Sequence, residues 1–586
     1  MALPPLRYRP IFITNLVLFS YVIATILCIA PLIIWLIRLN DGPFTGPSIF
    51  FDGLIPGYIA TILRFVAVKQ VGAFTQTMPF CIMASGKVQH RHAFRTILTT
   101  HIPFESTIPS FGSPKQLDEL LELLNAPTVF VIEILAGNLF RRQYIRNGDS
   151  YGLEGWEMNV GVCIGVIACL VTLDIIASTI MVFLFRRSTG LAEEPGSIAT
   201  LVGMARGAKH IWEDFHGLDI ERYPWKVRRR LSSMKYHISP DYTLSKYVLD
   251  KEAESTLEKV APEDEDTASI TSPPCANPRP ARFDYVPWFV RSPFLSIWSA
   301  ALFGGFVAAL SLGLRGSRDD GFDPLVPTAP LPYLGLSCAD ILWSFFPAYV
   351  AVFYRQILGN IDKFYRVVQP YADLHYGNAG FHILGMNYSA DLFPFITINA
   401  IRNKHWRVAL SSFLSFTSSL LPIFATSMFY VGYPDGSTEK RLLIYQPVFN
   451  LAVATMALLS LTFLALVPTR LYFMPHPLET FADHLSLLYN SSLLQETAFT
   501  FVPEIKPFSW PWAAKPSLSR KMEEFRDRNT EGFSMGIRKA CITENNCGGP
   551  HGICIDASQK VNAYYVEEDR DPEAHWKEIK HIISSF

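Results

Sequence analysis

Residues 11–37 contain no charged side chain, and a helix over these 27 residues is long enough to cross a membrane. A bilayer core about 30 Å thick needs about 20 residues of helix. Six further runs carry at most two charges each, at residues 48–68, 159–185, 292–314, 333–354, 408–431 and 446–467. These runs are apolar on every side, whereas helices of soluble domains have one polar face. The sequence therefore predicts an all-α integral membrane protein with seven clear transmembrane helices.

An eighth span is less clear. Residues 126–140 are short for a crossing and carry Glu133, so this segment either spans the membrane or is re-entrant. Residues 113–116 resemble a capping box with proline at the first helical position, and leucines follow at helical spacing. We expect an amphipathic helix that ends at Pro127 and lies on the membrane surface or packs on neighbouring protein.

The distribution of basic residues favours eight spans with a cytosolic N-terminus. That topology places 43 of the 51 Lys and Arg residues on the inner side. It divides the chain into a first membrane repeat at 1–185, a cytosolic loop at 186–291, a second membrane repeat at 292–467 and a cytosolic tail at 468–586. Residues 250–283, within the loop, have the acidic and proline-rich composition of a disordered connector. With 51 basic and 52 acidic residues, the chain has no excess charge to attract nucleic acid.

The chain matches itself when it is shifted by 291 residues. The segment beginning at Ile55 then lies on the segment beginning at Phe346 for 26 residues without a gap. The aligned pairs include Pro56 with Pro347, Tyr58 with Tyr349, Ala60 with Ala351, Arg64 with Arg355 and Pro79 with Pro370. We therefore predict two tandem repeats of four helices each. An even number of crossings makes such repeats parallel.

These paired spans, together with residues 185–219 (FRRSTGLAEEPGSIATLVGMARGAKHIWEDFHGLD) and residues 400–416 (AIRNKHWRVALSSFLSF), resemble a known family. It is the group of fungal multi-pass membrane proteins called domain of unknown function 3433. The resemblance covers the chain up to about residue 495. It implies a multi-pass membrane protein and implies no activity.

Three aspartates are candidate binding residues because a carboxylate inside a membrane is costly. Asp174 lies midway along residues 159–185 and is either an ion or proton site or a hydrogen-bonded carboxyl that fixes helix contacts. Asp340 and Asp52 lie near the outer ends of their spans, where solvation is the more ordinary explanation. Arg64 and Arg355 lie at the predicted inner boundary, where we expect them to extend toward the membrane surface; substrate binding is the alternative.

Other residues give weaker signals. Lys226, Arg228, Arg229 and Arg230 form a basic cluster that could meet anionic lipid of the inner leaflet or be an ordinary solvated surface. Cys541, Cys547 and Cys554 with His551 lack the close spacing of a zinc knuckle, so we expect no metal. The sequence has no Walker, dinucleotide-binding, zincin or hydrolase motif, so we expect neither a cofactor nor enzymatic activity.

The sequence thus favours a non-enzymatic scaffold or regulatory component of the plasma membrane or another secretory-pathway membrane, whose protein partners are unknown. The alternative is a transporter or ion pathway at the repeat interface that uses Asp174. The sequons at Asn387 and Asn490 should stay unmodified if they face the cytosol.

Overall fold

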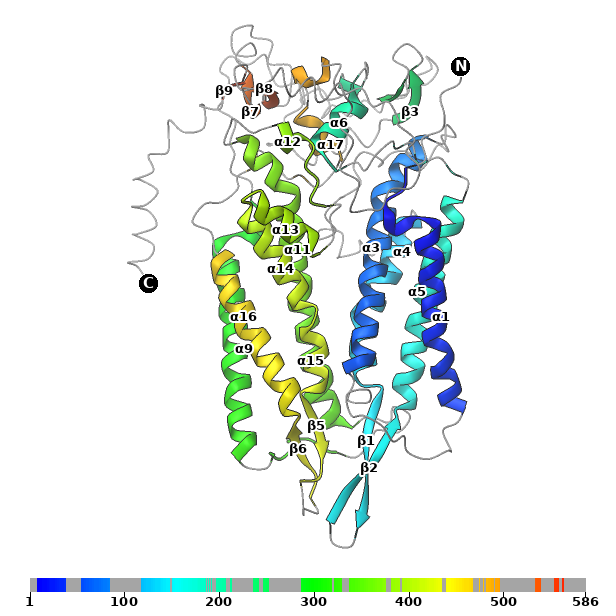
Figure 1. Ribbon diagram of the computed structural model, residues 1–586, viewed down its shortest axis with the longest axis vertical. Helices are drawn as coiled ribbons and strands as arrows, with labels where there is room; N and C mark the ends of the chain where they lie inside the picture. Colours follow the sequence, from blue (N-terminus) through cyan, green and yellow to red (C-terminus); the bar gives the residue numbers. More distant parts are fainter. Residues whose placement is uncertain are drawn as a thin grey trace, which may run out of the picture.

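Eight apolar helices run side by side in a computed structural model of the chain (Figure 1). The structure describes residues 8–37, 54–84, 117–147, 150–206, 236–251, 286–328, 337–434, 439–466, 481–495, 533–538 and 553–562, with short gaps inside several of these ranges. Within this part of the chain, eight helices are long and apolar enough to cross a membrane. The eighth span, left open by the sequence, is therefore present as a helix at Leu120–Gly137.

The first half contains four long helices. They are α1 (Asn15–Ile37), α3 (Leu54–Ala84), α4 (Leu117–Gly137) and α5 (Val160–Leu184). Helix α1 packs on α5, and α4 packs on both α3 and α5. A two-stranded antiparallel hairpin, β1 (Phe140–Asn147) with β2 (Ser150–Met158), joins α4 to α5.

The second half has four spans, two of which are interrupted. They are α9 (Ser292–Arg318), the span made of α10 (Cys338–Asp340), π-helical η4 (Ile341–Phe345) and α11 (Phe346–His375), the pair α14 (Trp406–Ser418) and α15 (Leu421–Ser427), and α16 (Gln446–Leu466). Helix α9 packs on α16, and α11 packs on α14 and α15. The hairpin β5 (Phe429–Gly432) with β6 (Arg441–Ile444) precedes α16.

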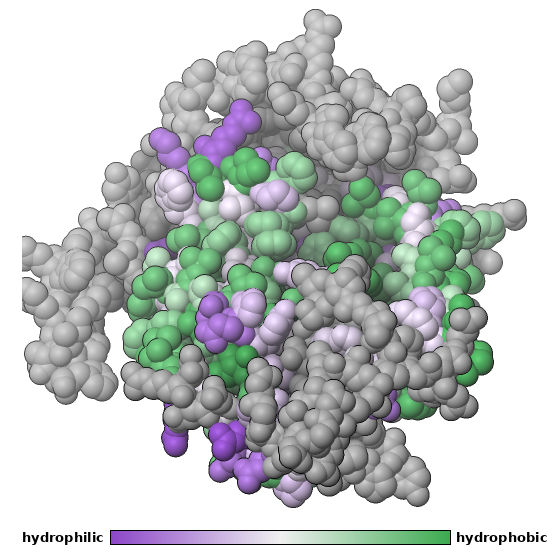
Figure 2. Space-filling view, turned by 60° about the horizontal axis from the view of Figure 1, so that its bottom comes forward, coloured by the Kyte–Doolittle hydropathy of each residue, from purple (hydrophilic) through white to green (hydrophobic). Residues whose placement is uncertain are grey.

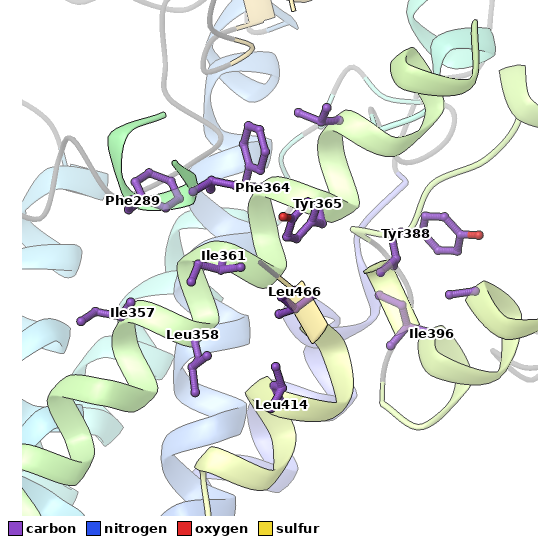
Figure 3. Close-up of a cluster of buried hydrophobic side chains, with 14 of the residues drawn as sticks. Phe289, Ile357, Leu358, Ile361, Phe364, Tyr365, Tyr388, Ile396, Leu414 and Leu466 are labelled. Atoms are coloured by element: carbon purple, nitrogen blue, oxygen red, sulfur yellow. The ribbon is translucent and has the colours of Figure 1, made fainter. Parts of the chain in front are cut away.

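The core of the second half is centred on α11. Ile361, Tyr365 and Leu414 are almost fully buried there, and Figure 3 shows them with their neighbours from α11, α14 and α16. Short helices add to this core, namely η3 (Trp288–Val290), α12 (Phe381–Leu384) and α13 (Phe395–Arg402). Apolar side chains also dominate much of the coloured surface in Figure 2, as expected of helices that face lipid.

The two ends of the bundle differ. The hairpins β1–β2 and β5–β6 lie at one end in Figure 1, which we call the outer end following the predicted topology. Helices α6 (Ile198–Ala205) and α17 (Phe481–Ser486) lie at the opposite, inner end and contact each other. The ring of Phe481 packs edge-on against Phe80 of α3 at a centroid distance of 5.3 Å. Parts of the predicted loop and tail therefore pack on the inner ends of the spans.

Small strands complete the described elements. They are the hairpin β3 (Tyr236–Asp241) with β4 (Lys246–Lys251) and the sheet of β7 (Phe533–Arg538), β8 (Ile553–Ala557) and β9 (Val561–Asn562). Two single turns are η1 (Ile11–Ile13), before α1, and η5 (Ser492–Gln495).

One local expectation was wrong. Helix α4 continues through Pro127 to Gly137, although the sequence predicted that a surface helix would end at this proline. Proline removes the backbone donor for the carbonyl four residues earlier, which is that of Leu123, and membrane helices tolerate such a break where neighbouring protein surrounds it. The hydroxyl of Thr128 adds a bond to the carbonyl of Leu124 at 2.8 Å. The structure has one helix across the two segments.

Candidate functional site

Two arginines and one glutamate meet between the halves. Nε of Arg64, on α3, lies 2.8 Å from Oε1 of Glu133, on α4. Arg355, on α11, donates from Nη1 to Oε2 of the same carboxylate. The side chain of Glu133 is fully buried, and those of Arg64 and Arg355 are 11% and 6% exposed. We call these residues the charge triad, and it joins three helices across the two halves.

The charge triad lies well inside the span. Arg64 is ten residues into α3, which corresponds to about 15 Å along the helix. Arg355 lies near the middle of the candidate span Cys338–Leu374. Both positions differ from the expected inner boundary, because α3 and α11 continue to Ala84 and His375 as unbroken helices. The two arginine side chains are therefore buried and paired with Glu133 inside the protein, which differs from the expected extension toward the membrane surface.

The charges of the triad do not cancel. Two guanidinium groups face one carboxylate, which leaves a formal charge of +1 if all three residues are ionised. Nε of Arg355 is buried and has no hydrogen-bond partner within the described residues. The next carboxylate along α11 belongs to Asp362, which pairs with Arg366 and accepts a hydrogen bond from Ser411 at 3.2 Å. Asp362 is thus already engaged by other groups.

Helix α11 carries a polar face that leads from the triad to the inner end. Its residues recur at intervals of three and four, which places them on one side of the helix: Arg355, Gly359, Asp362, Arg366, Gln369 and Asp373. Nε2 of Gln369 donates to Oδ1 of Asp373 at 2.8 Å. The other carboxylate oxygen of Asp373 lies 3.0 Å from Nε2 of His405. The polar face therefore continues into a bonded network.

Packing between the halves is tight on the outer side of the triad. A Cβ placed on Gly137 of α4 would lie 2.4 Å from Oγ1 of Thr426 in α15. The hydroxyl oxygen of Ser344, in η4, lies 2.6 Å from Oδ1 of Asn138 and 2.7 Å from the carbonyl oxygen of Thr426, and its single proton can bond either acceptor. These contacts close the interface toward the hairpin end.

The inner side of the triad is less filled. Gly359 lies one turn inward from Arg355 on the polar face, and a Cβ placed there would meet nothing within 4 Å in the described part of the protein. Both of its neighbours on this face, Arg355 and Asp362, are buried. Gly359 itself is half-buried, so this open space one helical turn from a buried, incompletely balanced charge is a candidate binding site.

Two tyrosine–histidine pairs lie at the inner end of α11. The hydroxyl of Tyr388 is 2.6 Å from Nδ1 of His405, and that of Tyr371 is 2.7 Å from Nδ1 of His484. Asn403 also donates to Tyr388, at 3.0 Å. Each of these side chains is bonded within its own set, Tyr371 with His484 and Tyr388 with His405 and Asn403. We therefore assign both sets to the packing of α12, α13 and α17 on α11.

The sequence-derived candidates lie away from the charge triad. Asp174 is on α5 and accepts a hydrogen bond from Thr25 of α1, on the side of the first half remote from α11. Asp340 accepts from the backbone and hydroxyl of Ser337 at 2.9 and 2.8 Å, as part of a capping box. Asp52 lies outside the described residues. The structure brings none of the three together.

The sequence did contain a signal for the observed site. Arg64 and Arg355 align across the predicted repeat, and Glu133 is a charge inside a short span. Their contact could not be predicted, because no sequence pattern connected α4 to the aligned pair.

Several other candidate residues lie outside the described part of the chain: Lys226, Arg228, Arg229, Arg230, Asn490, Cys541, Cys547 and His551. Cys554 is in β8, opposite Gly536. Among the residues that are described, no group of three or more His, Cys, Asp and Glu could hold a metal ion. Asn387 is described and accepts a hydrogen bond from the backbone of Ser389 at 3.1 Å.

Comparison with known proteins confirms the family resemblance over one segment. The family described as protein of unknown function (DUF3433) matches residues 341–430. This segment runs from η4 to β5 and includes Arg355 and the polar face of α11. No curated protein and no solved structure matches the chain.

Proposed function

We propose that this membrane protein forms a pathway for a solute or ion between its two halves, and that the charge triad is the central site of this pathway. The observation that carries the proposal is the burial of Arg64, Glu133 and Arg355 together inside the span. An ionisable residue in a membrane helix costs about 2.5–3.5 kcal/mol at the helix centre on insertion scales. Such residues commonly mark substrate or ion routes.

The arrangement of the halves supports this assignment. Transporters built from repeats commonly bind their substrate near the membrane midplane where the repeats meet. The charge triad lies between the two halves that we predict to be repeats, with tight packing on its outer side and open space at Gly359 on its inner side. These features describe a site that is closed from the outside.

The site differs from the one that the sequence offered. In the predicted repeat Asp174 aligns roughly with Ala457, so it has no polar counterpart in the other half, which made transport the weaker hypothesis. The hydrogen bond between Thr25 and Asp174 favours a packing role for this aspartate. The pathway that we propose depends instead on the triad, and it needs no catalytic chemistry.

The second candidate is a static scaffold, which the sequence favoured. It is supported by the close contact of Gly137 with Thr426, because tightly packed halves resist movement. In a scaffold the triad would only hold the halves together. The two candidates differ in whether water reaches the triad.

Water access to Gly359 tests the proposal. A Gly359→Cys variant, in a background with the nine native cysteines replaced, is treated in membrane vesicles with a charged, membrane-impermeant methanethiosulfonate reagent. We expect modification when the reagent is applied to the inner side and none from the outer side. The readout is the remaining free thiol, measured by mass tagging on a gel.

Gly304→Cys is the matched control. Gly304 lies on the exposed face of α9, and a Cβ there would also meet no atom within 4 Å in the described structure. This cysteine would face lipid and should stay unmodified from either side. If Gly359→Cys and Gly304→Cys are equally unreactive, the pathway is excluded and the scaffold is favoured.

A further inference from the structure

We infer that the space between Arg64, Arg355 and Gly359 binds a small oxyanion, of the carboxylate or phosphate type. This inference rests on the proposed function and names the class of ligand that the pathway takes. It depends on three observations: the charge balance of the triad, the unpaired donor, and the open volume beside it.

The charge balance requires a second anion. Arg64 and Arg355 are close enough to repel each other, and Glu133 neutralises only one of them. Helix α15 packs against α3 and α4 on the outer side of the triad and contains no charged residue. A bound anion would remove the remaining positive charge from a region where an unbalanced charge is costly.

The hydrogen-bonding geometry is also incomplete. Nε of Arg355 is buried without an acceptor among the described residues, whereas Nε of Arg64 and Oε1 of Glu133 lie 2.8 Å apart without the alignment of a hydrogen bond. Guanidinium groups present a planar set of donors that matches carboxylate and phosphate oxygens. Two arginines therefore favour an oxyanion over a spherical halide.

The open volume lies where such a ligand would fit. Gly359 is half-buried one turn inward from Arg355 on the same face of α11, and no described side chain, including those of Arg64 and Arg355, comes within 4 Å of its Cβ position. The outer side offers no comparable room, since Gly137 and Gly57 approach Thr426 and Ile423 closely. The ligand would thus reach the triad from the inner side.

Thermal unfolding and equilibrium binding of the purified full-length protein test this inference. The protein in non-ionic detergent is titrated with inorganic phosphate, sulfate, acetate and chloride at constant ionic strength. A further arm uses dihexanoyl phosphatidylglycerol, so that a lipid headgroup is distinguished from a free solute. We expect saturable stabilisation by at least one oxyanion, and binding by the lipid alone would identify the headgroup as the source.

Variants assign the binding to the triad. Arg355→Gln should weaken oxyanion binding about tenfold, as expected for the loss of one charge-assisted contact worth about 1.4 kcal/mol. Glu133→Gln should strengthen the binding, because it removes the competing carboxylate. Gly359→Leu should block binding by filling the open volume while leaving all three charges in place.

Arg315→Gln is the control for loss of one positive charge, since Arg315 is exposed on α9, and it should leave binding unchanged.

The responses of these variants distinguish an anion-binding triad from a triad that only stabilises the fold. A structural triad predicts that Arg355→Gln and Glu133→Gln both lower the unfolding temperature and that neither changes the response to anions. That result, or equal responses to all four anions and in all variants, would overturn the inference. Because Gly359→Cys accessibility needs no anion, the proposed pathway can stand while the anion site fails, and the reverse also holds.

Discussion

At the scale of single residues, one carboxylate connects the two halves. Glu133 contacts Arg64 from its own half and Arg355 from the other half, and it is fully buried. Removing a partner from a buried ion pair leaves the other charge unbalanced, which commonly costs about 3–5 kcal/mol. The stability of the whole interface should therefore be sensitive to this one side chain.

The energetic coupling between Glu133 and Arg355 tests this view of the triad. We predict that a double-mutant cycle with Glu133→Gln and Arg355→Gln gives a coupling free energy of about 1–3 kcal/mol. The two residues form an ion pair across the halves, so each substitution alone should cost more than it does after the other. The measurement is the unfolding free energy in mixed micelles.

A cycle of Asp174→Asn with Arg355→Gln is the control. Asp174 bonds Thr25 on the far side of the first half, so its coupling to Arg355 should be close to zero. Equal coupling in both cycles would mean that the effect is general loosening of the fold and does not come from the ion pair.

At the scale of helices and strands, the sequence predicted the spans and missed their lengths. Apolar composition identifies a span because lipid contacts every side of it. It did not reveal how far α3 and α11 extend, since Lys69 and Gln70 interrupt the apolar run of α3 and the inner turns of α11 are polar. Phe80, in the inner part of α3, packs on α17. Arg64 was placed at a boundary for this reason.

The sequence analysis also did not predict the hairpins β1–β2 and β5–β6 at the outer end. The residues of β1–β2 lie in a polar connection that shows no regular alternation of apolar and polar residues, the pattern that predicts a half-buried strand. The hairpin β5–β6 pairs Phe429 with Ile444, and its first residues lie within the run assigned to the seventh span. Periodicity alone does not separate short apolar strands from the end of an apolar helix.

The contact of α4 with α15 closes the outer side of the interface. We predict that Gly137→Ala lowers the unfolding free energy by about 1–3 kcal/mol, because the new methyl group would overlap Thr426. Adding Thr426→Gly should recover part of this loss, so the double variant should be more stable than the sum of the single effects implies. Unfolding of the purified variants in mixed micelles measures these changes.

Gly304→Ala is the control for the helical preference of alanine over glycine, because Gly304 has open space around its Cβ position. It should be neutral or stabilising. If Gly137→Ala is equally harmless, α4 and α15 do not approach as closely as the structure shows.

At the scale of the whole molecule, both halves share an order of elements. Each begins with a short 3₁₀ turn and an apolar helix, continues through a second and a third span, and has a β-hairpin before its last helix. In each half the first span packs on the last, as α1 does on α5 and α9 does on α16. This order agrees with the predicted duplication, which remains a prediction.

The charge triad could not be derived from the duplication alone. The aligned arginines suggested two equivalent positions, whereas the structure uses a single glutamate from α4 to hold both. Its contacts depend on how the two halves are placed beside each other, and a single sequence carries no direct signal for that placement. The sequence therefore predicted the membrane class and the spans, and the site required the structure.

The charge triad requires that α4 and α11 contact each other across the two halves. The rings of Phe130 and Tyr349 lie edge to face at this contact, with centroids 5.1 Å apart. Phe130→Cys with Tyr349→Cys, in a cysteine-free chain with a protease site inserted between residues 252 and 285, allows the halves to be cross-linked in membranes. Ile62→Cys with Tyr349→Cys is the control pair, since Ile62 is on the exposed side of α3.

After treatment with a short bifunctional thiol reagent and cleavage of the connector, the two halves are separated on a denaturing gel. We predict that the Phe130–Tyr349 cysteine pair holds them together as one band and that the Ile62–Tyr349 pair releases them as two. Two bands from both pairs would contradict the placement of the halves, and with it the site between them.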